Sequence, residues 1–187
     1  MNDDRLKRYN DSIYLTGFMA TGKSTTGKEL SKRLEMPFRD LDQIIVNGAG
    51  KSIHKVFEED GEPHFRKLER EYLMELSRVF TGVVALGGGA LQNQQIIDHL
   101  KLNGLLIYIS TPFEIIADRV YKDTERPIVF DKQGKRKDKD TLFKELKTLY
   151  SGRKKFYEQA QITIHADRYS SNEKLMEALL LKIKQHV

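Results

Sequence analysis

A glycine-rich motif constrains the fold of this chain more than any other sequence feature. Residues 17–24 read Gly-Phe-Met-Ala-Thr-Gly-Lys-Ser, which fits the pattern G-x-x-x-x-G-K-[ST] of a phosphate-binding loop. Such a loop curls backbone N–H groups around phosphate oxygens and lies at the positive end of a helix. A β-prone run over 12–16 precedes the motif, and a helical pattern over 23–34 follows it. The motif therefore predicts nucleotide binding by a strand–loop–helix unit.

Apolar strand candidates alternate with helical patterns along the rest of the chain. Further strands are predicted at 38–42, 83–86, 105–109 and 162–164. Further helices are predicted after Ser52, around Pro63, after a capping box over 111–114, and over 142–150 and 175–183. This alternation predicts an α/β fold with a five-stranded parallel sheet flanked by helices. With the phosphate-binding loop after its first strand, the pattern resembles the fold of phosphate-loop nucleoside monophosphate kinases. We expect residues 1–187 to form a single domain and the polar segment 122–140 to form a mobile lid.

The composition narrows the class of protein. The 187 residues include 39% hydrophobic and 32% charged residues and no cysteine, so disulfides and thiolate metal sites are excluded. No apolar run approaches the roughly 20 residues that cross a bilayer, and the charged stretch 1–8 does not resemble a secretory signal. We expect a cytoplasmic protein that binds no membrane. The net charge of +5 comes partly from the stretch 132–139, which lacks aromatic residues for base stacking and predicts a solvated loop rather than a nucleic-acid site.

Two aspartates at the end of the second predicted strand are candidate metal and substrate ligands. The sequence there is Asp40-Leu41-Asp42, whereas the third strand ends in glycines without an acid. The carboxyl ends of parallel strands meet at the ligand crevice. At this position, one aspartate can hold Mg²⁺ while the other faces a second substrate. In the loop itself, Lys23 supplies charge to the β- and γ-phosphates and Ser24 ligates Mg²⁺.

The order of the motifs resembles the shikimate kinase family. The family pattern is a phosphate loop ending in Gly-Lys-Ser/Thr, then Asp-x-Asp, Phe-Arg, Gly-Gly-Gly, Arg-Pro, and a late arginine before an aromatic residue. This chain has, in the same order, Lys23-Ser24, Asp40-Leu41-Asp42, Phe65-Arg66, Gly87-Gly88-Gly89, Arg126-Pro127, and Arg153 with Tyr157. Each later motif is weak alone, but the ordered set is specific and covers nearly the whole chain.

The resemblance implies that a monomeric enzyme transfers the γ-phosphoryl group of ATP to the 3-hydroxyl of shikimate. Asp42 would contact the shikimate hydroxyls and serve as base, with Lys23 and Arg126 as the other catalytic residues. Mg²⁺ would be held by Ser24 and, through water, by Asp40. The residues implied to bind ATP are Gly17, Ala20, Thr21, Gly22, Lys23, Ser24, Thr25, Arg119 over the adenine, and Arg126 in the lid.

The acid substrate is implied to bind along a helical segment over 42–78. Arg66 and Arg153 would clamp its carboxylate, since the guanidinium fork suits bidentate capture of a carboxylate. The residues implied to line its ring are Gly87, Gly88, Gly89, Phe57 and Phe65.

Two other functions remain open from the sequence. One is a kinase of another small hydroxylated acid, such as gluconate. The other is a nucleotide-dependent binding protein or nucleic-acid module without turnover, whose binding to nucleic acid would fall steeply with salt.

Overall fold

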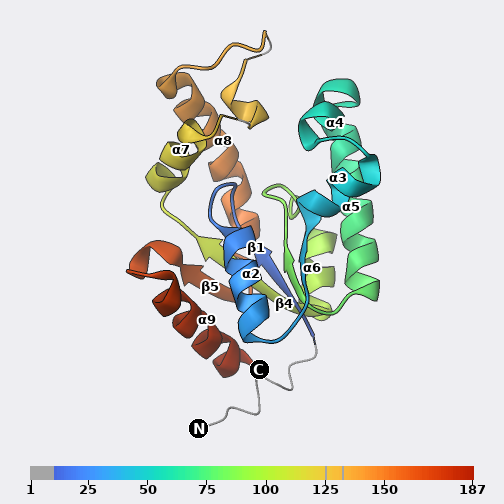
Figure 1. The fold of residues 1–187 in the computed structure, drawn as a ribbon, viewed down its shortest axis with the longest axis vertical. Coiled ribbons are helices and arrows are strands. Elements are labelled where there is room, and N and C mark those ends of the chain that lie inside the picture. Colours follow the sequence, from blue (N-terminus) through green and yellow to red (C-terminus); the bar gives the residue numbers. More distant parts are fainter. Residues whose placement is uncertain (1–10, 125, 132) are drawn as a thin grey trace.

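Five parallel strands form the centre of the fold in the order β2-β3-β1-β4-β5 (Figure 1). This computed structural model describes residues 11–124, 126–131 and 133–187. The strands are β1 (Ser12–Thr16), β2 (Phe38–Asp40), β3 (Val83–Ala85), β4 (Gly104–Ser110) and β5 (Ile162–His165). Leu15 is in register with Ala85 on one side and Ile107 on the other, so β1 lies in the middle of the sheet. The predicted five-stranded parallel sheet is confirmed.

Helices cover both faces of the sheet (Figure 1). They are α2 (Lys23–Arg33), α3 (Leu41–Ala49), α4 (Ile53–Glu59), α5 (Gly61–Val79), α6 (Gln94–Leu102), α7 (Phe113–Lys122), α8 (Lys139–Tyr157) and α9 (Asn172–His186). Two short 3₁₀ turns are η1 (Pro127–Val129) and η2 (Ala166–Arg168). No helix among the described residues is long and apolar enough to cross a membrane.

Alternate side chains of the central strands enter two different cores. Ile13 and Leu15 of β1 pack with α2 and α9 on one face, whereas Tyr14 packs with α3, α5 and α6 on the other. A third apolar cluster joins α7 and α8 to Tyr108 of β4 and to Phe18 of the phosphate loop. Because the central strands are buried on both faces, they read as continuous apolar runs in the sequence.

The second strand is shorter than predicted, and a helix begins where it was expected to continue. β2 ends at Asp40, and α3 starts at Leu41. One oxygen of Asp40 accepts a hydrogen bond from the backbone N–H of Asp42 at 3.1 Å, which caps the helix. The two aspartates diverge because one caps α3 and the other lies in its first turn. On a continuous strand, residues two apart would point to the same face. The β-branched residues of α3 concealed this helix from the sequence patterns.

The capping box expected over 111–114 is wrong. α7 begins at Phe113 with Pro112 as its N-cap, and no side chain caps it. A residue before proline is held in extended conformation, so Thr111 stays at the end of β4 and lies one residue too early to cap the helix. Its hydroxyl is buried and has no hydrogen-bond partner among the described residues. The cap predicted at Ser52 is confirmed, since its side chain accepts from the backbone N–H of Lys55.

The segment between α7 and α8, which we predicted to be a lid, has local structure of its own. Val129 is fully buried in the cluster of α7 and α8. Phe130 and Arg136 form an antiparallel bridge, and the Lys137 ammonium lies 2.6 Å from the carboxylate of Glu145. The segment thus has an apolar anchor and a hairpin-like tip. Within the range 122–140, Glu125 and Lys132 lie outside the described residues, and the mobility of the segment stays a prediction.

The packing of α9 on the sheet gives a stability prediction. Leu179 is 0% exposed, whereas Leu181, two residues along the same helix, is 55% exposed. Leu179→Ala leaves a cavity between α9 and the sheet, so we expect a loss of about 2–5 kcal/mol in the free energy of unfolding. Leu181→Ala should change it by about 0.5 kcal/mol or less. Urea denaturation measures both, and equal losses would contradict the packing described here.

Candidate active site

The phosphate-binding loop is closed by its own backbone and side chains. Gly17 has φ of 141°, and a Cβ atom at this position would lie 2.6 Å from the carbonyl oxygen of Ile109. The Thr21 hydroxyl and the Lys23 ammonium both donate to the carbonyl of Phe18 at 2.8 Å. The loop therefore needs glycine where it touches β4, and Lys23 is folded back under the phosphate-binding backbone.

Lys23 is a buried cation. Burial lowers its pKa to about 8, and the nearby carboxylate of Asp42 partly opposes this shift. The positive charge of Arg126, in the predicted lid, lowers the pKa of Lys23 further. An ammonium poorly solvated by water is strongly attracted to a bound anion, so Lys23 is suited to hold phosphate charge.

Ser24 and Asp40 form a pair of oxygen donors at the mouth of the loop. The Ser24 hydroxyl donates a hydrogen bond of 2.5 Å to one oxygen of Asp40. The first helical residues after the loop and the end of β2 thus bring a hydroxyl and a carboxylate to one point. Mg²⁺ prefers such oxygen ligands and keeps other positions for water and phosphate oxygens, so this donor set fits it.

Asp42 lies between the phosphate loop and the glycine turn that follows β3. Burial, followed by the nearby charge of Asp40, raises the pKa of Asp42, whereas Lys23 and Arg126 lower it. A Cβ atom on Gly87 would lie 2.9 Å from the Asp42 carboxylate and 2.3 Å from that of Glu69. The first glycine of the turn therefore leaves the space that two buried carboxylates occupy.

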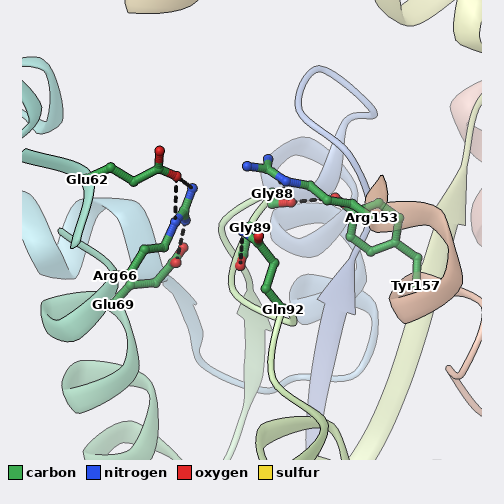
Figure 2. A network of polar contacts seen from close by, with 8 residues as sticks. All are labelled: Glu62, Arg66, Glu69, Gly88, Gly89, Gln92, Arg153 and Tyr157. Carbon is green, nitrogen blue, oxygen red and sulfur yellow. Dashed lines mark hydrogen bonds and ion pairs between the residues drawn. The ribbon is translucent and has the colours of Figure 1, made fainter. Parts of the chain in front are cut away.

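Arg66 lies on the α5 side of the glycine turn and is held between two carboxylates (Figure 2). Its guanidinium lies 2.6 Å from Glu69 and 3.1 Å from Glu62. The side chain of Glu69 is only 4% exposed, and burial raises its pKa against the opposing charge of Arg66. A Cβ atom on Gly89 would lie 2.4 Å from the Arg66 guanidinium. The arginine is therefore fixed in direct contact with the turn.

Arg153 lies on the opposite side of the same turn (Figure 2). It is buried on α8, and its Nη1 lies 3.5 Å from the carbonyl oxygen of Gly88. Tyr157 donates to the same carbonyl, and Gln92 donates to the carbonyl of Gly89 at 3.1 Å. Two arginines from distant helices thus flank one glycine turn, which is an arrangement suited to a planar carboxylate.

The remaining predicted site residues lie at the edges of this centre. Phe65 is buried in the core and its ring packs 4.6 Å from that of Phe57, which is only partly buried. Arg119 is exposed and donates to the carbonyl of Ala20 in the phosphate loop at 3.0 Å. Arg126 pairs with Asp123 at 2.7 Å. The roles of these residues toward ligands stay predictions.

Comparison with known proteins identifies the family. The profile of the family described as "Shikimate kinase" matches residues 19–184. The shikimate kinase of Salinibacter ruber is 43% identical over 157 residues, which are 83% of this chain and 77% of that protein. The chain belongs to the shikimate kinase family.

Solved structures of shikimate kinases have the same fold. The enzyme of Bacteroides thetaiotaomicron superposes with a TM-score of 0.84 at 30% identity and covers 93% of this chain and 98% of its own. The enzyme of Acinetobacter baumannii, solved in complex with shikimate, gives 0.80 at 29% identity and covers 98% of both chains. A gluconokinase of Sinorhizobium meliloti is 13% identical with a TM-score of 0.51, so it shares the fold alone. The gluconate alternative is therefore the weaker one.

Sequence patterns missed two polar residues of this shikimate kinase site, Glu69 and Gln92, and named a third, Tyr157, only as the aromatic residue after Arg153. Glu69, Gln92 and Tyr157 all contact the glycine turn or its arginines. In the sequence, Glu69 is one of several charged residues of α5 and carries no mark of its own. It lies three residues after Arg66, and this spacing permits a contact on one helix face. Gln92 and Tyr157 carry no chemical signature of their own. They reach the turn only through the packing of α8 and of the loop after β3.

The low pKa of Lys23 predicts a pH dependence of ATP binding. In the free protein, the ammonium loses its proton as pH rises through about 8. Phosphate favours the charged form, so ATP binding above this pH takes up a proton and weakens by up to about tenfold per pH unit. Isothermal titration calorimetry in buffers of different ionisation enthalpy measures both effects. Lys23→Met should bind weakly and without this dependence, and a wild-type Kd unchanged from pH 7 to 9.5 would contradict the assignment.

Proposed function

We propose that this enzyme transfers the γ-phosphoryl group of ATP to the 3-hydroxyl of shikimate, giving shikimate 3-phosphate and ADP. Membership of the shikimate kinase family makes ATP-dependent phosphorylation of shikimate its activity. The observation that carries the substrate assignment is the glycine turn flanked by Arg66 and Arg153. Both cations can meet one carboxylate there, and the side-chain-free turn lets a small ring approach the backbone.

The reacting hydroxyl is proposed to lie beside Asp42. This carboxylate is electrostatically coupled to Lys23 on the phosphate side and to Arg66 on the acid side. A hydroxyl bound there would therefore face the γ-phosphate. Phosphoryl transfer passes through a loose transition state, which leaves positioning and charge neutralisation as the main work of the protein. Asp42 is thus proposed to orient the hydroxyl and to accept its proton late.

Mg²⁺ is proposed to be held by Ser24 and, through water, by Asp40. The pair of oxygen donors described above supports this assignment. An ion held there would neutralise negative charge that develops on the phosphoryl group in the transition state. The residues of this chain then position the phosphates: the backbone of the loop from Gly17 to Thr25 cradles them, and Lys23 supplies fixed charge.

The division of the chain into parts is also a proposal. Residues 1–187 would form one kinase domain, with the acid-binding helical segment at 42–78 and the lid at 122–140. In Figure 1, α3, α4 and α5 stand on one side of the phosphate loop, with the segment after α7 on the other. Arg119 is proposed to lie over the adenine, since it already contacts the phosphate loop, and Phe57 and Phe65 to border the acid site. Action as a monomer in the cytoplasm, without nucleic acid or membrane, stays a prediction.

A coupled ADP-release assay tests the function and the role of Asp42 together. The wild-type enzyme should turn over shikimate and not gluconate, nucleoside monophosphates or single-stranded DNA. Asp42→Asn preserves size but removes the charge, so turnover should fall by about two to four orders of magnitude, the range of general-base effects. ATP affinity, measured by calorimetry, should change little. Turnover of gluconate equal to that of shikimate would overturn the substrate, and near-normal turnover by Asp42→Asn would overturn the role.

The lid proposal rests on Arg126. Its charge acts on both Lys23 and Asp42, and the adjoining proline stiffens the backbone that carries it. Arg126→Ala should therefore lower kcat by about 10³-fold, as expected for a cation that stabilises the transferring phosphoryl group. Lys135→Gln is the matched control, because it removes one positive charge from an exposed side chain of the same segment. It should change kcat only a few-fold.

Hydrogen exchange checks the motion of the lid. Among the described residues of 126–137, Val129 is the only one whose side chain is fully buried. The amides of this segment should therefore exchange readily in the free enzyme. Binding of a non-hydrolysable ATP analogue together with shikimate should slow them, since closure excludes water. Equal protection in both states, or a larger loss of kcat from Lys135→Gln than from Arg126→Ala, would contradict the lid.

A further inference from the structure

The carbonyl oxygen of Gly88 is shared by two side chains of α8 (Figure 2). The Tyr157 hydroxyl donates a hydrogen bond to it, and Nη1 of Arg153 lies 3.5 Å from it. The two residues are four apart in sequence, so both lie on one face of the helix. Two donors that come from one helix face therefore reach a single acceptor on the glycine turn.

Tyr157 is fixed in place and keeps its proton at neutral pH, so its hydroxyl can donate. It is 1% exposed, and its ring packs on that of Tyr108 with centroids 5.5 Å apart. Burial raises the pKa of its hydroxyl, and the nearby charge of Arg153 only partly offsets this. The hydroxyl therefore stays protonated and holds the Gly88 carbonyl.

Arg153, in contrast, is only weakly engaged by the same carbonyl. A separation of 3.5 Å is at the outer limit for a hydrogen bond, whereas a guanidinium has five N–H donors. Figure 2 shows its guanidinium directed into the space between α8 and Arg66 on α5. Because Tyr157 donates to the Gly88 carbonyl and Arg153 reaches it with one N–H group only, further N–H donors of the guanidinium are left for a ligand in that space.

We propose that Tyr157 is a positioning residue, whose hydroxyl occupies the Gly88 carbonyl and thereby keeps the Arg153 guanidinium on the carboxylate of the acid substrate. This inference rests on the proposed function. Without the hydroxyl, the Gly88 carbonyl would be short of a donor, and Arg153 is the donor beside it. Its guanidinium would turn to the carbonyl and away from the substrate. Gly88 also abuts the phosphate loop, since a Cβ atom on it would lie 3.1 Å from the Met19 nitrogen, so the same contact aligns the acid with the phosphates.

The first test is Tyr157→Phe, which keeps the ring and its packing on Tyr108. The KM for shikimate should rise about tenfold, as expected when hydrogen bonding to a charged group is impaired. The KM for ATP should stay within twofold, and kcat should fall less than the KM rises. The matched control is Tyr150→Phe, which removes a hydroxyl two turns earlier on α8 and should leave the KM for shikimate within twofold. An unchanged KM for shikimate in Tyr157→Phe would overturn the inference.

The second test asks whether Tyr157 acts through recognition of the substrate carboxylate by Arg153. The carboxamide analogue of shikimate lacks the charge that Arg153 recognises, so Tyr157→Phe should lower kcat/KM for shikimate but hardly for the analogue. The quotient of kcat/KM for the acid and kcat/KM for the amide does not depend on the fraction of enzyme that is folded. In an Arg153→Ala background, Tyr157→Phe should cause no further loss. Equal losses for acid and amide, or additive losses with Arg153→Ala, would overturn the positioning role while leaving the proposed function intact. A wild-type enzyme inactive on shikimate would overturn the function and this inference together.

Discussion

The active site depends on the close approach of two loops that leave the carboxyl ends of neighbouring strands. The phosphate loop follows β1 and touches the end of β4 at Gly17, and the glycine turn follows β3 and touches the phosphate loop at Gly88. A Cβ atom on Gly17 would lie too close to β4, at 2.6 Å, and one on Gly88 would make a tight contact of 3.1 Å with the phosphate loop. Backbone contact without side chains is what brings a phosphate site and an acid site within reach of one another.

Burial then strengthens the charges that surround this contact. Burial lowers the pKa of Lys23 and raises the pKa of Asp42 and of Glu69. In each case a neighbour of opposite charge opposes the shift. A buried pair such as Arg66 and Glu69 adds little net stability, because desolvation offsets the attraction. Its physical effect is to fix the guanidinium beside the turn. The charged side chains of the site therefore hold one another in place, and a bound ligand of opposite charge would add to the attraction that each cation feels.

Helix α8 connects the proposed lid to the proposed binding site of the substrate carboxylate. It runs over 19 residues from the end of the lid segment to Tyr157, a length of about 28 Å at the usual rise per residue. Its buried stripe begins with Leu142 and Leu146 near the lid and ends with Arg153 and Tyr157 at the glycine turn. One helix thus packs against the proposed lid at one end and carries the proposed carboxylate ligand, Arg153, at the other.

The sequence by itself determined the sheet and the phosphate loop, because apolar runs and G-x-x-x-x-G-K-S are local patterns with a local physical cause. The other candidate site residues came from the ordered motifs shared with the family, and their roles stay predictions. The sequence missed α3, since whether Asp40 ends a strand or caps a helix is decided by what packs against Leu41 and Ile45. The sequence also did not reveal which side chains contact the glycine turn. Glu69, Gln92 and Tyr157 gain their meaning from contacts between segments distant in the chain, and only tertiary packing sets such distances.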